Sequence, residues 1–299
     1  MFEIADRLLA AVDAGRVLVV ATAISIEGSA PRTVGTSMAW DGEAVIGSIA
    51  GGCVEGAVVE ACEAVLAGAP AHTVEYGVSD ETAFAVGLTC GGIIRVHVQP
   101  FTPELEAGLR EGRDLEVCRD FSERPPVESR MIIFGAMEFS TALAAAARVM
   151  GYRVTVVDPR PLFATAERFP GVETVVVWPT EYLASTTIDE RTVICVLSHD
   201  ARFDAELIAQ ALALPVAYVG AMGSRATHDR RIASLLERGV TPAALAALHS
   251  PIGLDLGAST PQETAISILA EVLAARTDTT ALPLTVLDGA IHTRRSVRA

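Results

Sequence analysis

The chain of 299 residues contains no lysine, and all 23 of its basic residues are arginine. A Walker A phosphate-binding loop, a pyridoxal Schiff base and a lysine-dependent aldolase mechanism each need a lysine, so all three are excluded. The 37 acidic residues outnumber the basic ones and leave a net charge of −14. A duplex-DNA-binding protein needs a basic face, so we expect no nucleic-acid partner.

Long apolar runs are also missing. Although 51% of the residues are hydrophobic, no uninterrupted apolar run reaches the roughly 18 residues of a membrane-spanning helix. The N-terminal residues 1–6 are acidic and amphipathic, without the basic start of a signal sequence. We therefore expect a cytoplasmic protein with no membrane span.

Cysteine is scarce, with five residues in the whole chain. The low, odd number argues against a disulfide framework, and no C-x-x-C or H-x-x-x-H spacing indicates a zinc site. Cys62 lies inside a helical pattern and Cys195 inside a strand-like run. We predict that these two and Cys118 are small hydrophobic residues of the core.

The other two cysteines lie beside glycine pairs, in the segments Gly51-Gly52-Cys53-Val54-Glu55 and Leu88-Thr89-Cys90-Gly91-Gly92. Glycine lets a ligand or another chain approach a neighbouring sulfur closely. A helical pattern begins at Val54 and ends at Gly68, which places Cys53 at a helix N-terminus, where the dipole and free N–H groups favour a thiolate. Two interpretations stay open: reactive sulfurs in one shared site, or structural residues.

The first half of the chain has the pattern of an α/β domain. Asp41-Gly42 is the signal of a two-residue hairpin, and residues 119–129 are polar with a Pro-Pro pair, as in an interdomain linker. We therefore expect an N-terminal α/β domain, a linker, a Rossmann-like domain and a C-terminal extension: residues 1–118, 119–129, 130–276 and 277–299. Within the first domain we expect a helix, a strand, a polar loop and two later strands: residues 2–14, 17–23, 27–35, 71–76 and 93–98.

The second half alternates strand and helix patterns, which predicts a mainly parallel sheet with helices on both faces. The expected strands are residues 131–134, 153–157, 174–177, 192–197 and 216–219. A helix is predicted over 261–275, because Thr260 offers an N-cap, Pro261 suits the first helical position and Glu263 the third.

The first of these strands leads into a turn resembling that of dinucleotide-binding proteins. Gly135 supplies the tight turn, and Asp158 ends the second strand at the distance of a ribose-binding acid. Met137 and Ser140, however, replace the second and third glycines of that signature. We expect the Rossmann architecture but no tight binding of NAD.

Two more polar clusters follow strands, where such folds bind ligands. His199 in Ser198-His199-Asp200 is either a hydrogen-bonded structural residue or a functional one. Gly223-Ser224-Arg225 precedes a helix and either holds a phosphate or forms an ordinary helix start with a surface arginine.

Taken together, the motifs resemble the XdhC/CoxI family, the accessory proteins of xanthine dehydrogenase and carbon monoxide dehydrogenase. The likeness runs in order along the chain to about residue 276, and the family's usual Gly-Ala-Gly-His turn differs from Gly135-Ala136-Met137-Glu138. The matching segments are Gly28-Ser29-Ala30-Pro31-Arg32 with Gly35, residues 47–55, residues 87–92, Ser198-His199-Asp200, Tyr218-Val219-Gly220 with Gly223-Ser224-Arg225, residues 250–257 and Thr260-Pro261-Gln262-Glu263.

The resemblance implies a chaperone that binds molybdenum cofactor (molybdopterin, in a mono- or dinucleotide form) and protects it. It also implies sulfuration of the cofactor with a cysteine desulfurase partner and delivery to an apo molybdenum hydroxylase. The implied fold is an N-terminal domain of the family's own type joined to a Rossmann domain, commonly in a homodimer.

For such a carrier we expect the cofactor between the two domains and no catalytic residues, since no acid/base pair or nucleophile triad is visible. Cys53 and Cys90 are candidate molybdenum ligands, because molybdenum binds sulfur. Arg32 and Arg225 are candidates for the phosphate. The complete candidate site is Arg32, Gly51, Gly52, Cys53, Cys90, Gly91, Gly92, His199, Gly223, Ser224 and Arg225.

Two alternatives from other classes remain. The first is an NAD(P)- or flavin-dependent oxidoreductase that uses the Rossmann-like domain with His199 as acid/base. The second is a passive nucleotide-sensing module in which the cysteines are inert.

Overall fold

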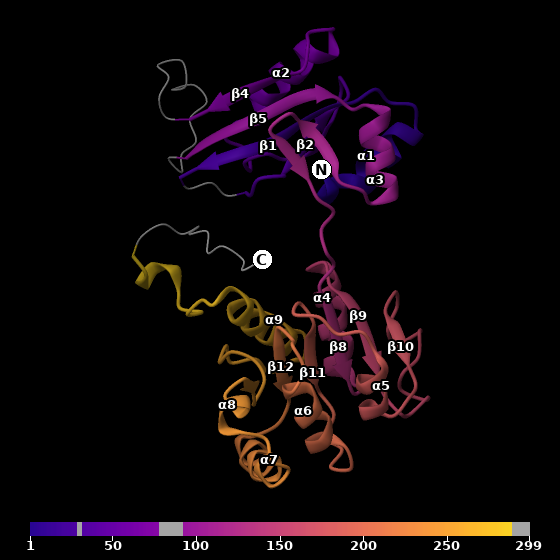
Figure 1. The fold of residues 1–299 in the computed structure, drawn as a ribbon, viewed down its shortest axis with the longest axis vertical. Helices are drawn as coiled ribbons and strands as arrows, with labels where there is room; N and C mark the ends of the chain where they lie inside the picture. The colour runs from indigo at the N-terminus through magenta and orange to yellow at the C-terminus, as the bar shows by residue number, and fades with distance from the viewer. Residues whose placement is uncertain (29–31, 78–91, 289–299) are drawn as a thin grey trace. The chain divides into compact units, whose positions relative to one another are not determined.

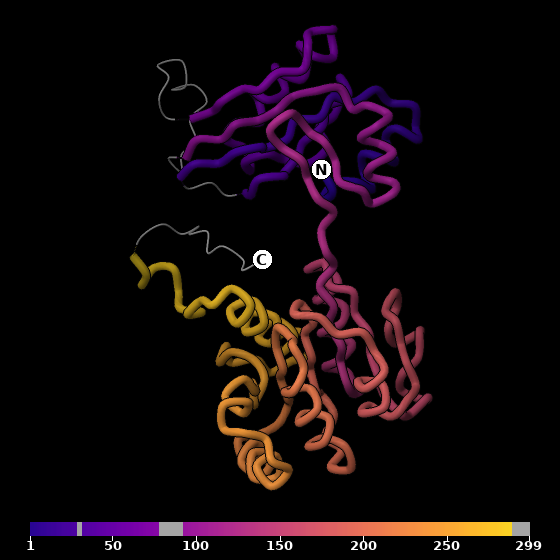
Figure 2. Tube along the Cα trace, in the orientation of Figure 1, coloured from indigo at the N-terminus to yellow at the C-terminus, as the bar shows by residue number. Residues whose placement is uncertain are grey.

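A computed structural model describes residues 1–28, 32–77 and 92–288. The chain divides into two compact units, Met1–Pro126 with Leu284–Ala299, and Val127–Pro283. Figure 1 shows their elements as ribbons and Figure 2 the same path as a tube. Among the described residues, no helix combines the length and the apolar character needed to cross a membrane.

The first unit is built on an antiparallel sheet in the strand order β3-β2-β1-β5-β4. Its strands are β1 Val19–Glu27, β2 Ser37–Trp40, β3 Val45–Gly47, β4 His72–Tyr76 and β5 Ile93–Pro100. Strands lie where the apolar patterns over 17–23, 71–76 and 93–98 predicted them.

Helices cover both faces of this sheet. Helix α2 (Glu55–Leu66) packs on one face, in a core shared with alternate residues of β1 such as Val19 and Ala21. The other face holds α1 and α3 together with the small hairpin of β6 and β7, against Leu18 and Val20. These elements are η1 Phe2–Ile4, α1 Ala5–Asp13, α3 Pro103–Glu111, β6 Leu115–Cys118 and β7 Phe121–Glu123. Strand β7 therefore lies inside the stretch expected as a linker.

The hairpin between β2 and β3 differs from the expected two-residue turn, because four residues separate Trp40 from Val45. The Asp41 carboxylate accepts hydrogen bonds from the backbone N–H groups of Glu43 (2.8 Å) and Ala44 (2.7 Å). This side chain closes the longer loop, so the two-residue prediction was wrong although the hairpin itself is confirmed.

The second unit contains a parallel sheet in the order β10-β9-β8-β11-β12-β13. Counted along the chain this is the order 3-2-1-4-5-6 of dinucleotide-binding folds, and it confirms the expected Rossmann-like architecture. The strands are β8 Arg130–Phe134, β9 Arg153–Val157, β10 Glu173–Val175, β11 Val193–Val196, β12 Tyr218–Ala221 and β13 Leu248–His249.

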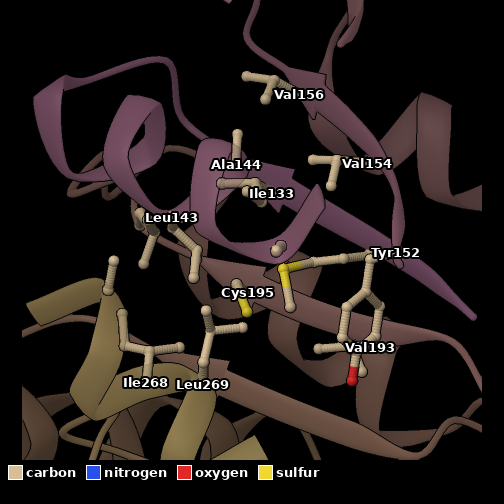
Figure 3. Close-up of a cluster of buried hydrophobic side chains, with 14 of the residues drawn as sticks. Ile133, Leu143, Ala144, Tyr152, Val154, Val156, Val193, Cys195, Ile268 and Leu269 are labelled. Atoms are coloured by element: carbon tan, nitrogen blue, oxygen red, sulfur yellow. The ribbon is translucent and has the colours of Figure 1, made fainter. Parts of the chain in front are cut away.

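Both faces of this sheet are buried, as alternate strand residues show. Figure 3 shows Ile133 and Cys195 on the face where Leu143 of α4 and Ile268 of α9 pack. The neighbouring strand residues contact α5, α6 and α7 on the opposite face. The helices are α4 Glu138–Val149, α5 Pro179–Ser185, α6 Asp204–Leu212, α7 Arg225–Glu237, α8 Pro242–Leu245 and α9 Pro261–Thr277, followed by η3 Leu284–Val286.

Helix α9 begins as predicted. The Thr260 hydroxyl accepts a hydrogen bond from the Glu263 N–H (3.2 Å), and the Glu263 carboxylate accepts one from the Thr260 N–H (2.9 Å). The reciprocal pair satisfies donors that the helix start would otherwise leave unpaired.

Candidate functional site

A cleft of about 290 Å³ lies at the carboxyl ends of β8, β9 and β11, where the strand order of the Rossmann-like sheet reverses. Open α/β sheets bind their ligands at such a point. The cleft is lined by Met137, Asp158, Pro159, Arg160, Ser198, His199, Asp200, Ala201 and Phe203.

Gly135 allows the turn after β8 to approach the end of β11. Its φ is +102°, and a Cβ at this position would lie 2.8 Å from the backbone nitrogen of Ser198. Any side chain here would push the two strand ends apart, so only glycine fits.

Asp158 lies at the end of β9, as expected, but its carboxylate is already engaged. It is 1% exposed, and it accepts hydrogen bonds from the Ala136 N–H (2.7 Å), the Arg160 N–H (2.9 Å) and the Arg160 guanidinium (2.8 Å). Burial raises the pKa of Asp158, but the hydrogen bonds from Arg160 and Ala136 outweigh it and hold that pKa below its usual value. Both carboxylate oxygens are used within the protein rather than presented to a ribose.

A second aspartate–arginine pair follows β11. Arg202 donates from its guanidinium to the Asp200 carboxylate, with a shortest distance of 2.6 Å. Hydrogen bonding by Arg202 is the main cause that lowers the pKa of Asp200 to about 2. His199 is exposed, lines the cleft, and forms no hydrogen bond to the part of the chain that is described.

A buried ionic network contacts the cleft through the lining residue Ser198. The sequence motifs did not reveal it. Arg231, 5% exposed, donates to the Asp204 carboxylate (3.0 Å), the Ser250 hydroxyl (2.9 Å) and the Met222 carbonyl (2.9 Å). Asp204 also accepts from the Ser198 hydroxyl (3.1 Å). One signal was available in the sequence: Arg231 lies one helical turn before the apolar Leu235, so both share a helix face, and the structure shows that this face packs inward.

At the predicted phosphate site before α7, one backbone N–H of the helix start is engaged by a side chain. The Ser224 hydroxyl accepts a hydrogen bond from the Thr227 N–H (3.2 Å) and caps the helix. Arg225 is exposed at the first helical position, and Gly223 packs against Thr227. The side chain of Arg225 does not line the cleft that contains His199.

In the first unit, Cys53 lies two residues before the first residue of α2, as the helix pattern predicted. The loop around it is organised by Glu55. The Glu55 carboxylate accepts hydrogen bonds from the Ser48 hydroxyl (2.6 Å) and from the N–H groups of Ala50 (2.9 Å), Gly52 (2.7 Å) and Val54 (3.2 Å). The N–H groups expected to be free beside the thiol are therefore in part taken up by a carboxylate, which corrects the sequence-based expectation.

Burial opposes the charge of Glu55, but these hydrogen bonds lower its pKa to about 2. Gly51 and Gly52 adopt φ values of +78° and +115° and have open space where a Cβ would lie. Cys53 itself is half-buried. A fixed negative charge, a half-buried sulfur and open glycines thus lie together at the start of α2.

Four more site candidates belong to this unit: Arg32, Cys90, Gly91 and Gly92. Arg32 is exposed and forms an ion pair with Glu3 (2.7 Å), and Gly92 is buried directly before β5. Cys90 and Gly91 lie outside the described residues, so a site shared by Cys53 and Cys90 stays a prediction. Within the described ranges, no three metal-ligating side chains gather into a cluster.

Two of the other cysteines are core residues, as predicted. Cys62 and Cys195 are fully buried. Burial raises the pKa of the Cys62 thiol to about 12 and raises that of Cys195 as well. Cys118 is half-buried at the end of β6.

The fold and the cleft define a two-domain α/β protein whose C-terminal domain is of the Rossmann type. Two family models match this chain: the one described as the XdhC Rossmann domain over residues 131–272, and the one described as the XdhC and CoxI family over residues 11–77. The chain belongs to the XdhC and CoxI family.

Three relatives are similar over most of this chain. It is 26% identical to a probable xanthine dehydrogenase subunit of Bacillus subtilis, over 86% of this chain and 93% of that protein. It is 28% identical to the molybdenum cofactor insertion chaperone PaoD of Escherichia coli, over 88% of this chain and 84% of PaoD. It is also 28% identical to the uncharacterized protein YqeB of Escherichia coli over 84% of this chain, but spans only 42% of YqeB.

The fold is similar to that of a solved structure described as a xanthine dehydrogenase from Bacillus halodurans. The TM-score is 0.74 at 24% sequence identity, over 94% of this chain and 97% of the other. At that identity the likeness supports the shared fold.

Proposed function

We propose that this protein is a maturation chaperone that binds molybdenum cofactor and supplies it to a molybdenum hydroxylase. The observation that carries the proposal is the similarity to a molybdenum cofactor insertion chaperone over 88% of this chain and 84% of that relative. Such coverage takes in both units of the fold, so it does not rest on the widespread Rossmann architecture alone.

In this proposal the segment Gly51–Glu55 contacts the molybdenum end of the cofactor. Cys53 offers the sulfur, a ligand type that molybdenum accepts. The open glycines on its N-terminal side give a bulky ligand access to that sulfur. The proposal includes a cysteine desulfurase that supplies sulfur to the bound cofactor, a homodimeric assembly and Cys90 as a second ligand.

The test is to purify the full-length protein from cells that make molybdenum cofactor and from cells in which its synthesis is blocked. We expect molybdenum and a pterin absorption band only in the first preparation, and we expect that protein to activate an apo molybdenum hydroxylase. Equal metal content and no activation in both preparations would reject the chaperone function.

A nicotinamide-dependent oxidoreductase is the second candidate, and the strand order with Asp158 at the end of β9 is the observation in its favour. Against it, Asp158 is engaged by Ala136 and Arg160. Calorimetry with NAD(H) separates the two candidates, because only the oxidoreductase needs to bind that cofactor tightly.

A further inference from the structure

Two short segments with the same pattern, Asp158-Pro159-Arg160 and Asp200-Ala201-Arg202, lie at the cleft of the Rossmann-like unit. Their residues line the cleft except for Arg202, which lies between the lining residues Ala201 and Phe203. In each segment the aspartate accepts a hydrogen bond from the backbone N–H of the arginine two residues later, at 2.9 Å in the first and 3.0 Å in the second. In each, the guanidinium then returns to the same carboxylate. The two arginines are therefore held by their own segments, at the ends of β9 and β11.

An aromatic ring also contacts each guanidinium in a cation–π arrangement. The Arg160 guanidinium lies 4.4 Å from the ring centre of Phe163, and that of Arg202 lies 5.3 Å from the ring centre of Trp178. A guanidinium fixed by both a carboxylate and a ring has lost most of its rotamer freedom before any ligand arrives. Less conformational entropy is then lost when a ligand binds.

Each guanidinium keeps donors for a ligand. Arg160 uses Nε and Nη2 on Asp158, and Arg202 uses Nε and Nη2 on Asp200. The Nη1 groups of both arginines donate no hydrogen bond to the described residues. The side chains of Arg160 and Arg202 are 50% and 68% exposed, so these donors are accessible.

The two arginines also lie within electrostatic range of each other. Hydrogen bonding to Asp158 is the main cause that raises the pKa of Arg160. The charges of Asp158 and Asp200 raise it as well, and the charge of Arg202 has the smaller, opposite effect. Helix α4, which starts at the same cleft behind Met137, has no side-chain cap, and its exposed Glu138 is paired with Arg168 (3.0 Å). The positive end of the α4 dipole also favours an anion in the cleft.

We propose that this cleft binds the phosphate group of a phosphomonoester, clamped by Arg160 from the cleft lining and by Arg202 from its place between the lining residues Ala201 and Phe203. Two preorganised guanidinium groups suit a dianion with three terminal oxygens better than a singly charged diester. The volume of about 290 Å³ accommodates a phosphate and the part of the ligand next to it. This inference rests on the cleft alone and does not depend on the proposed chaperone function.

The experiment titrates the full-length protein with inorganic phosphate, adenosine 2′-monophosphate and 6-hydroxymethylpterin phosphate, using calorimetry and ³¹P line broadening. Adenosine and 6-hydroxymethylpterin serve as the unphosphorylated controls. We expect binding of the three phosphate-bearing probes alone. Arg202→Gln should weaken that binding about tenfold or more, since a charge-assisted contact is lost.

Arg191→Gln is the matched control. Arg191 pairs with Asp189 in the same Asp-X-Arg pattern (3.0 Å), but it precedes β11 and so lies at the opposite end of that strand from the cleft. The affinity of the Arg191→Gln variant for phosphate should equal that of the wild type.

Arg160→Gln should weaken binding as Arg202→Gln does. Its thermal unfolding must be recorded as well, since it leaves the buried Asp158 with fewer partners. Arg202 pairs with the more exposed Asp200, so its variant keeps the test valid if Arg160→Gln does not fold.

Binding of the phosphorylated probes that falls in Arg202→Gln and not in Arg191→Gln supports the clamp. Tighter binding of the pterin phosphate than of the adenosine phosphate assigns the site to a pterin ligand, and the reverse order assigns it to a nucleotide. No phosphate binding, or equal affinities in wild type and Arg202→Gln, overturns the inference. Either failure would leave the molybdenum content of the purified protein, and hence the chaperone proposal, unaffected.

Discussion

Glu55 is the residue on which the conformation of the Gly-Gly-Cys loop depends. One carboxylate accepts from three backbone N–H groups and one hydroxyl between residues 48 and 54. A loop with two glycines at positive φ has much conformational freedom to lose on folding, so a single organising acceptor determines where Cys53 lies. The structure thus explains why an acidic residue stands next to a candidate thiol ligand.

We predict that Glu55→Gln lowers the free energy of unfolding by about 1–3 kcal/mol, because the amide has one acceptor oxygen where the carboxylate had two and buried donors lose their partner. Chemical denaturation measures the loss. Glu63→Gln, an exposed position on the same helix, is the control and should change stability by less than about 0.5 kcal/mol. Equal effects of the two substitutions would contradict this role of Glu55.

The same carboxylate predicts a pH dependence. The pKa of Glu55 is lowered from 4.5 to about 2 in the folded chain. Its contribution to stability is therefore complete above pH 4.5 and is lost as the pH falls from 4.5 towards 2, where the folded protein must also bind the proton. Denaturation curves recorded between pH 6 and 2 should show a smaller loss of stability for Glu55→Gln than for the wild type. If stability falls equally with pH in both proteins, Glu55 is not the source of this pH dependence.

The two cysteines of α2 and its N-terminal loop should respond differently to substitution. Cys53→Ser is expected to lower molybdenum retention with little change in thermal stability, because the half-buried site near the helix start tolerates a hydroxyl. Cys62→Ser should lower the free energy of unfolding by about 1–3 kcal/mol, since it places a hydroxyl in the core. Metal analysis and thermal unfolding of both variants check the pair. Full retention of molybdenum in Cys53→Ser would remove this residue from the site.

At the scale of elements, the turn from β8 into α4 sets the geometry of the cleft. It brings the end of β8 against the end of β11 at Ser198, and the Ala136 N–H inside it holds Asp158. The Ser140 hydroxyl donates back to the Gly135 carbonyl, which ties the first turn of the helix to the strand end. The side chain that replaces the third glycine of the nucleotide signature thus has a structural partner.

We predict that Gly135→Ala lowers the free energy of unfolding by more than about 2 kcal/mol, from backbone strain at positive φ together with the contact to Ser198. Gly56→Ala is the control: Gly56 lies inside α2 without a positive φ and with no atom within 4 Å of the added Cβ. That substitution should stabilise the protein by about 0.5–1 kcal/mol. A Gly135→Ala variant as stable as the wild type would show that the strand ends can move apart freely.

At the scale of the whole molecule, a Rossmann-type unit is joined to a unit of a different architecture in one acidic chain. The strand order alone would suggest a dinucleotide enzyme. The cleft argues otherwise, since Met137 lines it where the signature has glycine and Asp158 is bound by Arg160.

We therefore predict that NAD(H) binds no tighter than millimolar, a free energy of only about −4 kcal/mol. The NAD ribose would find the Asp158 carboxylate already hydrogen-bonded to Ala136 and Arg160. The NAD pyrophosphate would meet the Met137 side chain where the signature has a glycine backbone. Calorimetry on the full-length protein measures the constant. A micromolar value would support the oxidoreductase instead of the carrier.

Local patterns in the sequence were sufficient for the elements and for the class of fold. Hydrophobic periodicity, the Thr260–Glu263 capping box and Gly135 act within one element or one turn, so neighbours in the chain carry the whole signal. The family motifs added the expected cofactor and partners. The hairpin at Asp41 was placed correctly, but its length was not, because a side chain closes the longer loop.

Only the tertiary structure decided which charges are free and which are engaged. Ala136 and Asp158 are 22 residues apart, and Asp204 and Arg231 are 27 apart. Spacing in the sequence does not reveal that such groups meet, since the pairing of β8 with β9 brings the first two together and the packing of α6 on α7 the other two. For the same reason Arg225, singled out by its motif, lies exposed beyond the cleft lining, whereas Arg160 lies in the cleft. The sign and position of a charge at a binding site depend on its nearest partners, and those partners come from distant parts of the chain.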